Sequence, residues 1–363
     1  MAAPSLPRVM TPSPFGMLPS GETVEEHTLS NGSGASATIL TYGGIVTSLR
    51  VPDRARRLAD VVLGFDNLEA YVCGRAYHGA IVGRIAGRVS AGRLLVDGRV
   101  HALPLNDGAN HLHGGHRGLD RRVWSADPAG AASLRLTYLS PDGEEGYPGN
   151  VTLTATYTLT DANALVFEIE AATDTVTAVS PTQHCYFNLA GEGSGSVLGH
   201  ELRVHGGAHV PADGSLTLCD RIEPVDGSGA DLRAARPLAG ALPRLFKAHG
   251  DLYVLRQPGS AAPHGPTLAA RLHEPASGRV LEVLTDEPCL QLYTGVALDG
   301  SQKGKSGTPY GPHAGLCLEC QGYPNAGRLD GLGGIILRPG SPRRRRTIYA
   351  FSTDNLPAKH TPS

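Results

Sequence analysis

Ser180-Pro-Thr-Gln-His-Cys-Tyr-Phe-Asn-Leu-Ala-Gly191 has the alternation of a β-strand and ends in glycine, a residue typical of turns. Successive side chains of a strand point to opposite faces, so this stretch predicts one apolar row and one polar row. The apolar row holds Cys185, Phe187 and Leu189, and the polar row holds His184, Tyr186 and Asn188. Such a polar row fits an ordinary half-exposed strand as well as a binding surface. The rest of the chain favours the binding surface.

Two later stretches repeat this alternation. In Cys289–Tyr293, Gln291 and Tyr293 share one face, and in Gly315–Gln321 the shared face holds Cys317, Glu319 and Gln321. If the three strands are neighbours, their polar rows line one cleft. Buried polar groups need hydrogen-bond partners, and a sugar supplies many hydroxyls. The three rows therefore predict a sugar-binding cleft.

The remainder of the sequence is typical of an all-β sandwich or barrel. Glycine and proline are abundant, with 47 and 27 residues, and short alternating runs are separated by turn residues. Hairpins are expected over residues 25–42, over 94–100 around an Asp-Gly turn, and over 151–171. We expect a single domain over residues 21–356, with loose tails over 1–20 and 357–363.

Charge and composition exclude several classes of function. The net charge of −2 over 363 residues favours neither nucleic acid nor a membrane surface. No stretch approaches the roughly 20 apolar residues of a membrane span, and the N-terminus lacks the apolar core of a signal peptide. We therefore expect a cytoplasmic protein. Six cysteines in a chain of this length do not form a disulfide framework.

Three motifs suggest other chemistry less strongly. His111 and His113 could chelate a metal, but no further ligands follow at a familiar spacing, so no metal is expected. Cys317 and Cys320 lie three apart on a strand, face opposite sides, and are expected to be buried thiols. The glycine-rich stretch 300–306 is one residue short of a phosphate-binding loop and is not followed by a helical pattern.

Six segments then resemble one family, in that family's order and over about residues 15–351. They are Gly83-Arg-Ile-Ala-Gly-Arg88, Leu112-His-Gly-Gly115, the acidic loop Asp142–Gly149, Thr182–Leu189, Gln291-Leu-Tyr-Thr-Gly295, and Cys317-Leu-Glu-Cys-Gln321 with Pro324-Asn-Ala. The chain resembles the aldose 1-epimerase (galactose mutarotase) family. This resemblance implies a large antiparallel β-sandwich with a shallow cleft on one concave face.

The resemblance also implies an activity, the interconversion of α and β anomers of free hexoses such as glucose and galactose. It implies a small-molecule aldose as the partner, no cofactor, and a monomer or homodimer. Glu319 corresponds to the catalytic base and His184 to the catalytic acid. The expected substrate contacts are Arg88, His113, Gln291, Asp251 and Tyr186.

Three positions depart from the family pattern. Gly87 stands where the family has Asn, and Gln183 replaces another Asn. The family's substrate-binding Asp lies in a G-x-D-H-N segment, for which Asp251 is the candidate. Its register is shifted by one residue, and the following His-Asn is missing.

The mechanism expected from these residues needs one base and one acid at opposite ends of the sugar's reacting unit. Glu319 is expected to be anionic at neutral pH, and His184 charged or close to its titration. Three alternatives remain open. A glycosidase would need a second carboxylate, from Glu144 or Glu145. A hexose-phosphate epimerase would need a basic pocket, to which Arg84 and Arg93 could contribute. A non-catalytic sugar-binding protein would not need the acid–base pair.

Overall fold

A computed structural model describes residues 8–9, 11–256, 265–325 and 334–354. Its named strand pairs are all antiparallel, and two layers of strands enclose an apolar core, which confirms the predicted all-β sandwich. No helix in the described part of the chain has the length and apolar character needed to cross a membrane.

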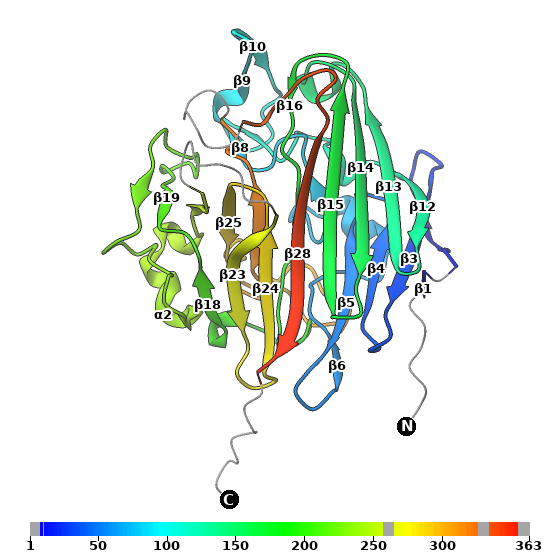
Figure 1. Ribbon diagram of the computed structural model, residues 1–363, viewed down its shortest axis with the longest axis vertical. Coiled ribbons are helices and arrows are strands. Elements are labelled where there is room, and N and C mark those ends of the chain that lie inside the picture. Colours follow the sequence, from blue (N-terminus) through cyan, green and yellow to red (C-terminus); the bar gives the residue numbers. More distant parts are fainter. Residues whose placement is uncertain (1–7, 10, 257–264, 326–333, 355–363) are drawn as a thin grey trace, which may run out of the picture.

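One layer is a nine-stranded sheet with β28 in its middle, between β15 and β24 (Figure 1). In spatial order its strands are β12 (Ser125–Gly130), β13 (Ser133–Ser140), β14 (Val151–Leu159), β15 (Ala164–Thr173), β28 (Arg343–Thr353), β24 (Arg279–Thr285), β23 (Thr267–His273), β18 (Glu201–Val204) and β21 (Arg236–Pro237). The expected hairpin over 151–171 is β14 and β15, which confirms that prediction.

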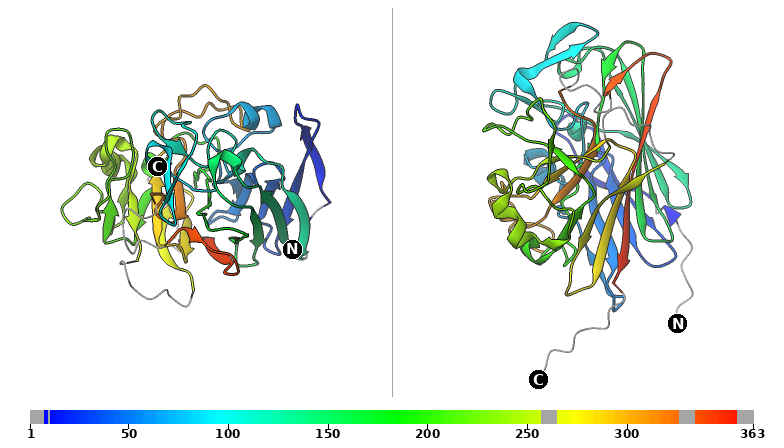
Figure 2. Two further views of the ribbon diagram at one scale, coloured as in Figure 1. Left: turned by 90° about the horizontal axis from the view of Figure 1, so that it is seen from above. Right: turned by 60° about the vertical axis from the view of Figure 1, so that its left-hand side comes forward.

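The other layer consists of two smaller sheets. The six-stranded sheet contains β1 (Arg8–Val9), β2 (Ser13–Met17), β3 (Thr23–Ser30), β4 (Ser36–Leu40), β5 (Val46–Pro52) and β6 (Leu58–Asp60). The five-stranded sheet contains β20 (Glu223–Pro224), β19 (Ala208–Val210), β22 (Leu252–Val254), β25 (Cys289–Tyr293) and β26 (Cys317–Gln321). Seen from above, the blue strands and the yellow-green segments lie at opposite ends of the molecule (Figure 2).

The stretch 180–191 joins these two smaller sheets, although it is not the continuous strand that its sequence predicts. Only Thr182–Gln183 forms a strand, β17, which pairs with β7 (Ile81–Val82). Beyond it, Phe187 makes one bridge to Val62, after β6, and another to Leu316, before β26. The stretch is therefore a seam whose backbone partners change along its length.

The predicted alternation of side chains across this seam is preserved. Its apolar row of Cys185, Phe187 and Leu189 packs into the main core, beside Tyr349 and Phe351 of β28. The leucines of β25 and β26 join the same cluster, so both strands turn their polar faces away from the core. Burying a side chain of this size is worth about 1.5–3 kcal/mol, so the core anchors the seam and the two strands together.

The remaining elements are short. Three further two-stranded ladders pair β8 (Arg88–Val89) with β11 (His111–Leu112), β9 (Arg93–Val96) with β10 (Arg99–Ala102), and β16 (Thr177–Ala178) with β27 (Ile336–Leu337). The helices are α1 (Leu68–Cys73), α2 (Leu238–Ala241) and the 3₁₀ turns Ser90–Gly92, Leu119–Arg121, Glu144–Gly146, Val197–Gly199, Leu242–Arg244 and Phe246–Ala248.

The sequence predicts loose tails over residues 1–20 and 357–363. Within the stretch 1–20, the described residues of β1 and β2 both pair with β3, so these two strands are not a loose tail. Pairing in a ladder satisfies the backbone groups of these two strands, which therefore belong to the six-stranded sheet. The expected tail over 357–363 lies outside the described residues.

Arg84 is a buried structural residue rather than part of a basic pocket. Its guanidinium donates to Ser140 Oγ and to the backbone oxygens of Ser140, Pro141 and Pro148, at 2.8–3.0 Å. The side chain is only 2% exposed. Four of its five N–H donors therefore hold the acidic loop against the sheet, and the buried side chain does not face the cavity beside β25 and β26.

We expect Arg84→Ala to lower the free energy of unfolding by about 2–4 kcal/mol, because it leaves several buried carbonyl oxygens without a donor. Urea denaturation measures this loss. Arg93→Ala is the control, since Arg93 is exposed and its removal should change stability by less than about 0.5 kcal/mol. Equal stability of the two variants would contradict the structural role of Arg84.

Candidate active site

A cavity of about 660 Å³ lies on the side of β25 and β26 that faces away from the core. Its wall includes Gln291 and Tyr293 from β25, Glu319 and Gln321 from β26, and His184 and Tyr186 from the seam. Gln291 lies directly opposite Glu319 in the ladder. The three polar rows therefore line one cleft except at two positions. Asn188 is buried and donates to the backbone oxygens of Gly195 and Ala314, and Cys317 is buried with its Sγ 3.5 Å from His184 Nδ1.

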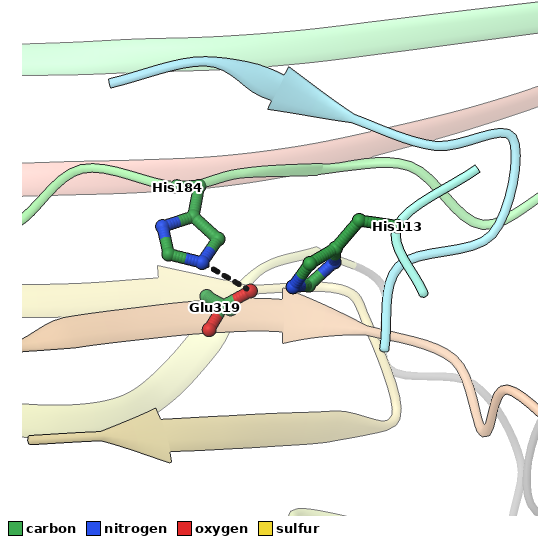
Figure 3. Close-up of side chains that lie close together, drawn as sticks. All are labelled: His113, His184 and Glu319. Carbon is green, nitrogen blue, oxygen red and sulfur yellow. Dashed lines mark ion pairs between the residues drawn. The ribbon is translucent and has the colours of Figure 1, made fainter. Parts of the chain in front are cut away.

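His184, His113 and Glu319 converge in this cavity (Figure 3). His184 Nε2 lies 3.7 Å from Glu319 Oε2. One polar atom from each of the three residues lies within 4.8 Å of the other two. The three residues come from a seam, a strand and a loop that are far apart in sequence, so only the fold brings them together.

His113 presents a hydrogen-bond donor to the cavity. The backbone N–H of Gly87 donates to His113 Nδ1 at 3.1 Å, so in the neutral ring Nε2 carries the proton. Burial lowers the pKa of His113 well below its usual range, which keeps the ring neutral at pH 7. Gly87 has φ +79°, a conformation that favours glycine.

A metal ion does not fit this cluster. Two histidines and a glutamate resemble a zinc ligand set, but a ligating nitrogen must offer a lone pair. The Gly87 N–H takes the Nδ1 lone pair of His113 and leaves Nε2 with a hydrogen facing the cavity. Both nitrogens of His111 contact other groups, Pro104 O and Tyr147 Oη, so His111 has no free nitrogen to chelate a metal together with His113.

The charge states of the acid–base pair differ from those expected. Burial raises the pKa of Glu319 to about 8, and the nearby charge of Arg88 only partly opposes this shift. Burial also lowers the pKa of His184 to about 4. At pH 7 these shifts favour a pair that carries one proton, held by Glu319, in place of the anionic carboxylate expected from the sequence. The cause is desolvation, which disfavours both charged forms.

Arg88 faces the cavity and is oriented by Asp107. Arg88 Nε donates to Asp107 Oδ2 at 2.6 Å, and both residues line the wall. Binding through Nε leaves the terminal nitrogens of the guanidinium available as donors. Gln291, which also lines the cavity, donates from Nε2 to Leu292 O at 2.7 Å, which fixes the direction of that amide.

We expect Asp107→Asn to raise KM by about 10-fold with a smaller change in kcat, because a charged hydrogen bond that orients Arg88 is weakened. Initial rates of mutarotation against sugar concentration separate the two constants. Asp142→Asn is a control outside the cavity wall. An unchanged KM for Asp107→Asn would show that Arg88 keeps its orientation without this partner.

Asp251 does not line the cavity, unlike the other expected substrate contacts. Its carboxylate lies 3.5 Å from His209 Nδ1, and the residue is 5% exposed. His249 and Gly250, which precede it, line the wall instead. Tyr186 does line the cavity, and its ring centroid lies 5.2 Å from that of His184.

Comparisons with known proteins agree with this geometry. The family model for aldose 1-epimerase matches residues 25–350. A galactose mutarotase from Rattus norvegicus is 40% identical over 345 residues, covering 94% of this chain and 98% of that protein. The chain belongs to the aldose 1-epimerase family.

Solved structures extend the likeness to the fold. A galactose 1-epimerase from Lactobacillus acidophilus superimposes with a TM-score of 0.80 at 29% identity, covering 94% of this chain and 98% of that one. A GalM/aldose epimerase homologue from C. elegans gives a TM-score of 0.83 at 29% identity, covering 90% and 98% of the two chains. The sandwich of this epimerase family member is thus shared with proteins of known structure.

Several cavity residues of this family member were not singled out from its sequence as site residues. Tyr77 and Tyr293 flank the histidines, with ring centroids 4.8 Å from His113 and 4.7 Å from His249 respectively. Asp107 is a turn residue in the sequence, and nothing in its spacing signals a cavity. Tyr293 was expected in the cleft, in the polar row that it forms with Gln291, but no contact with the sugar was assigned to it.

Proposed function

We propose that this protein interconverts the α and β anomers of free aldoses, with Glu319 and His184 as the groups that exchange protons. The observation that carries the proposal is their 3.7 Å separation in the wall of a cavity of about 660 Å³. Membership of the aldose 1-epimerase family supports the same activity. Glucose and galactose are the substrates proposed first.

The proposed reaction balances with the one proton that the pair holds. When sugar hydroxyls hydrogen-bond to Glu319, they stabilise its anion and favour transfer of the proton to His184. Glu319 then removes the proton from the anomeric hydroxyl while His184 gives its proton to the ring oxygen, and the bond between the first carbon and the ring oxygen breaks. Rotation about the first carbon–carbon bond and the reverse transfers give the other anomer.

Two further residues have proposed roles in this reaction. His113 Nε2–H can donate to the ring oxygen as negative charge develops there, since its tautomer is fixed by Gly87. Arg88 can fork onto ring hydroxyls, because Asp107 holds only its Nε. Tyr186 and Gln291 complete the proposed contacts with the sugar.

Two alternatives, a glycosidase and a hexose-phosphate epimerase, depended on residues that do not line the cavity. Glu144 accepts from Tyr138 and Glu145 from the backbone of residues 116 and 117, so neither lies across the cavity from Glu319 as a glycosidase requires. A hexose-phosphate epimerase would need Arg84 and Arg93 in the cavity. Arg84 instead donates to Ser140, Pro141 and Pro148, and Arg93 lies outside the cavity wall. The remaining alternative is a binding protein without catalysis.

Polarimetry of freshly dissolved α-glucose and α-galactose tests the proposal. We expect the first-order approach to the equilibrium rotation to accelerate in proportion to protein concentration. A heat-denatured sample controls for buffer catalysis. A rate that is independent of protein for every aldose tried would overturn the proposed function and favour a binding protein.

We expect kcat/KM to be highest between about pH 4 and about pH 8, since only there does the pair hold one proton. Above this window Glu319 loses its proton, and below it His184 gains one, so activity falls on both sides. Polarimetry across the window and about one unit beyond measures the profile, after subtraction of the uncatalysed rate at each pH. A limb centred at 6.5, the ordinary value for histidine, would show that His184 is not desolvated.

A further inference from the structure

The loop before β22 separates two neighbouring polar side chains. Thr294 N–H donates to His249 O at 3.0 Å, and Leu292 N–H donates to Asp251 O at 3.1 Å, so β25 fixes the backbone on both sides of Gly250. Gly250 has φ +109°, and a Cβ there would lie 2.4 Å from Leu292 O. Only glycine fits this turn, which breaks the strand alternation.

As a result, His249 lines the cavity and Asp251 does not. In a regular strand, residues two apart would share a face. Here the carboxylate of Asp251 is directed to His209 on the neighbouring strand β19, at 3.5 Å. The polar group that this loop gives to the cavity is therefore an imidazole.

The tautomer of His249 follows from its neighbours. Nδ1 lies 3.2 Å from Gly250 O, and a carbonyl can only accept, so Nδ1 carries the hydrogen and Nε2 has a lone pair. The ring packs against Tyr293, with centroids 4.7 Å apart. Burial lowers the pKa of His249 below its usual value, which favours this neutral form at pH 7.

The cavity offers a ligand both donors and acceptors, and His249 Nε2 adds an acceptor to its wall. Arg88 and the neutral His113 supply only donors to a ligand, whereas each sugar hydroxyl also has a hydrogen to donate. Asp107, the carboxylate beside Arg88, already accepts a hydrogen bond from that guanidinium. The Nε2 lone pair of His249, which lines the same cavity, complements these donors.

We propose that His249, through Nε2, accepts a hydrogen bond from one ring hydroxyl of the aldose and so determines which sugars this enzyme prefers. The inference rests on the proposed function. It replaces Asp251, the residue expected from sequence, as the contact from this loop. His249 has no part in proton transfer at the anomeric centre, so its effect is on sugar recognition.

A panel of monodeoxy sugars tests the contact. With the unaltered protein, we expect one of the 2-, 3-, 4- and 6-deoxy analogues of the preferred hexose to lose about 10-fold or more in kcat/KM, since it leaves the imidazole unpaired. With His249→Ala, kcat/KM for the parent sugar should fall by about the same factor, so the parent sugar and that analogue should then have similar kcat/KM values. His249→Gln places an amide oxygen near the former Nε2 and should restore part of the gap.

The outcomes separate this proposal from the proposed function. If the unaltered protein accelerates mutarotation but His249→Ala keeps the full discrimination among deoxy sugars, the role of His249 is wrong and the function stands. If Asp251→Asn, and not His249→Ala, closes the gap, the contact belongs to Asp251. If no sugar responds to the unaltered protein, the proposed function itself fails. Melting temperatures confirm that each variant is folded.

Discussion

Glu319→Gln is expected to lower kcat for mutarotation by at least about 10²-fold, and by up to about 10⁴-fold. The amide keeps the size and shape of the side chain but can neither take nor give a proton in the relevant pH range. The position is 2% exposed within β26, so a change of shape would also disturb the wall, which makes glutamine preferable to alanine. Polarimetry at saturating α-galactose measures kcat, and KM should change less because the amide still forms hydrogen bonds.

Glu287→Gln is the matched control for this result. Glu287 is also buried, and burial raises its pKa to about 7, but its partner is Arg345 at 3.5 Å and it does not line the cavity. We expect this variant to keep its turnover within about 2-fold, since it leaves the reacting groups untouched. Near-normal turnover by Glu319→Gln would remove the carboxylate from the mechanism.

Much of the candidate site could be predicted from sequence because strand alternation is a local property. Leu290, Leu292 and Leu318 face the core, so Gln291 and Glu319 must face the other way, whatever the neighbouring strands are. The same rule places His184 and Tyr186 together on the seam. It held even though the seam is not a regular strand, because side-chain direction depends on an extended backbone and not on continuous pairing.

Other features depend on contacts that no local pattern encodes. Asp251 was the expected sugar contact, but the positive φ at Gly250 reverses the direction of the loop, and that turn is set by Leu292 on another strand. Arg84 and Arg88 both stand among small residues in the sequence. In the fold, Arg84 donates to buried backbone carbonyls, whereas Arg88 faces the cavity.

The charge states of the acid–base pair could not be predicted from the sequence either, because they depend on burial in the folded chain. The pKa of Glu319 rises to about 8 because the whole cavity wall excludes water from it. The charge of Arg88, which opposes this rise, lies 231 positions away in the chain and is paired with Asp107 at 2.6 Å. Desolvation sums over many residues, so a residue's own neighbours in sequence cannot reveal it.

His184→Asn is expected to lower kcat by at least about 10²-fold as well, because asparagine cannot protonate the ring oxygen. His200→Asn is the matched control for removing a buried imidazole. His200 also has a pKa lowered by burial to about 4, accepts from Leu189 N–H at 3.0 Å, and lies outside the cavity wall. It should lose stability while keeping turnover per folded molecule.

The double variant of Glu319→Gln and His184→Asn shows whether the two groups act as one unit. Groups that share a single proton transfer are non-additive, so the double variant should be little slower than the slower single variant. The reason is that either change already blocks the concerted transfer across the sugar. If the two losses multiply instead, each group acts in a separate step, and the 3.7 Å pair would be two independent catalysts in one cavity.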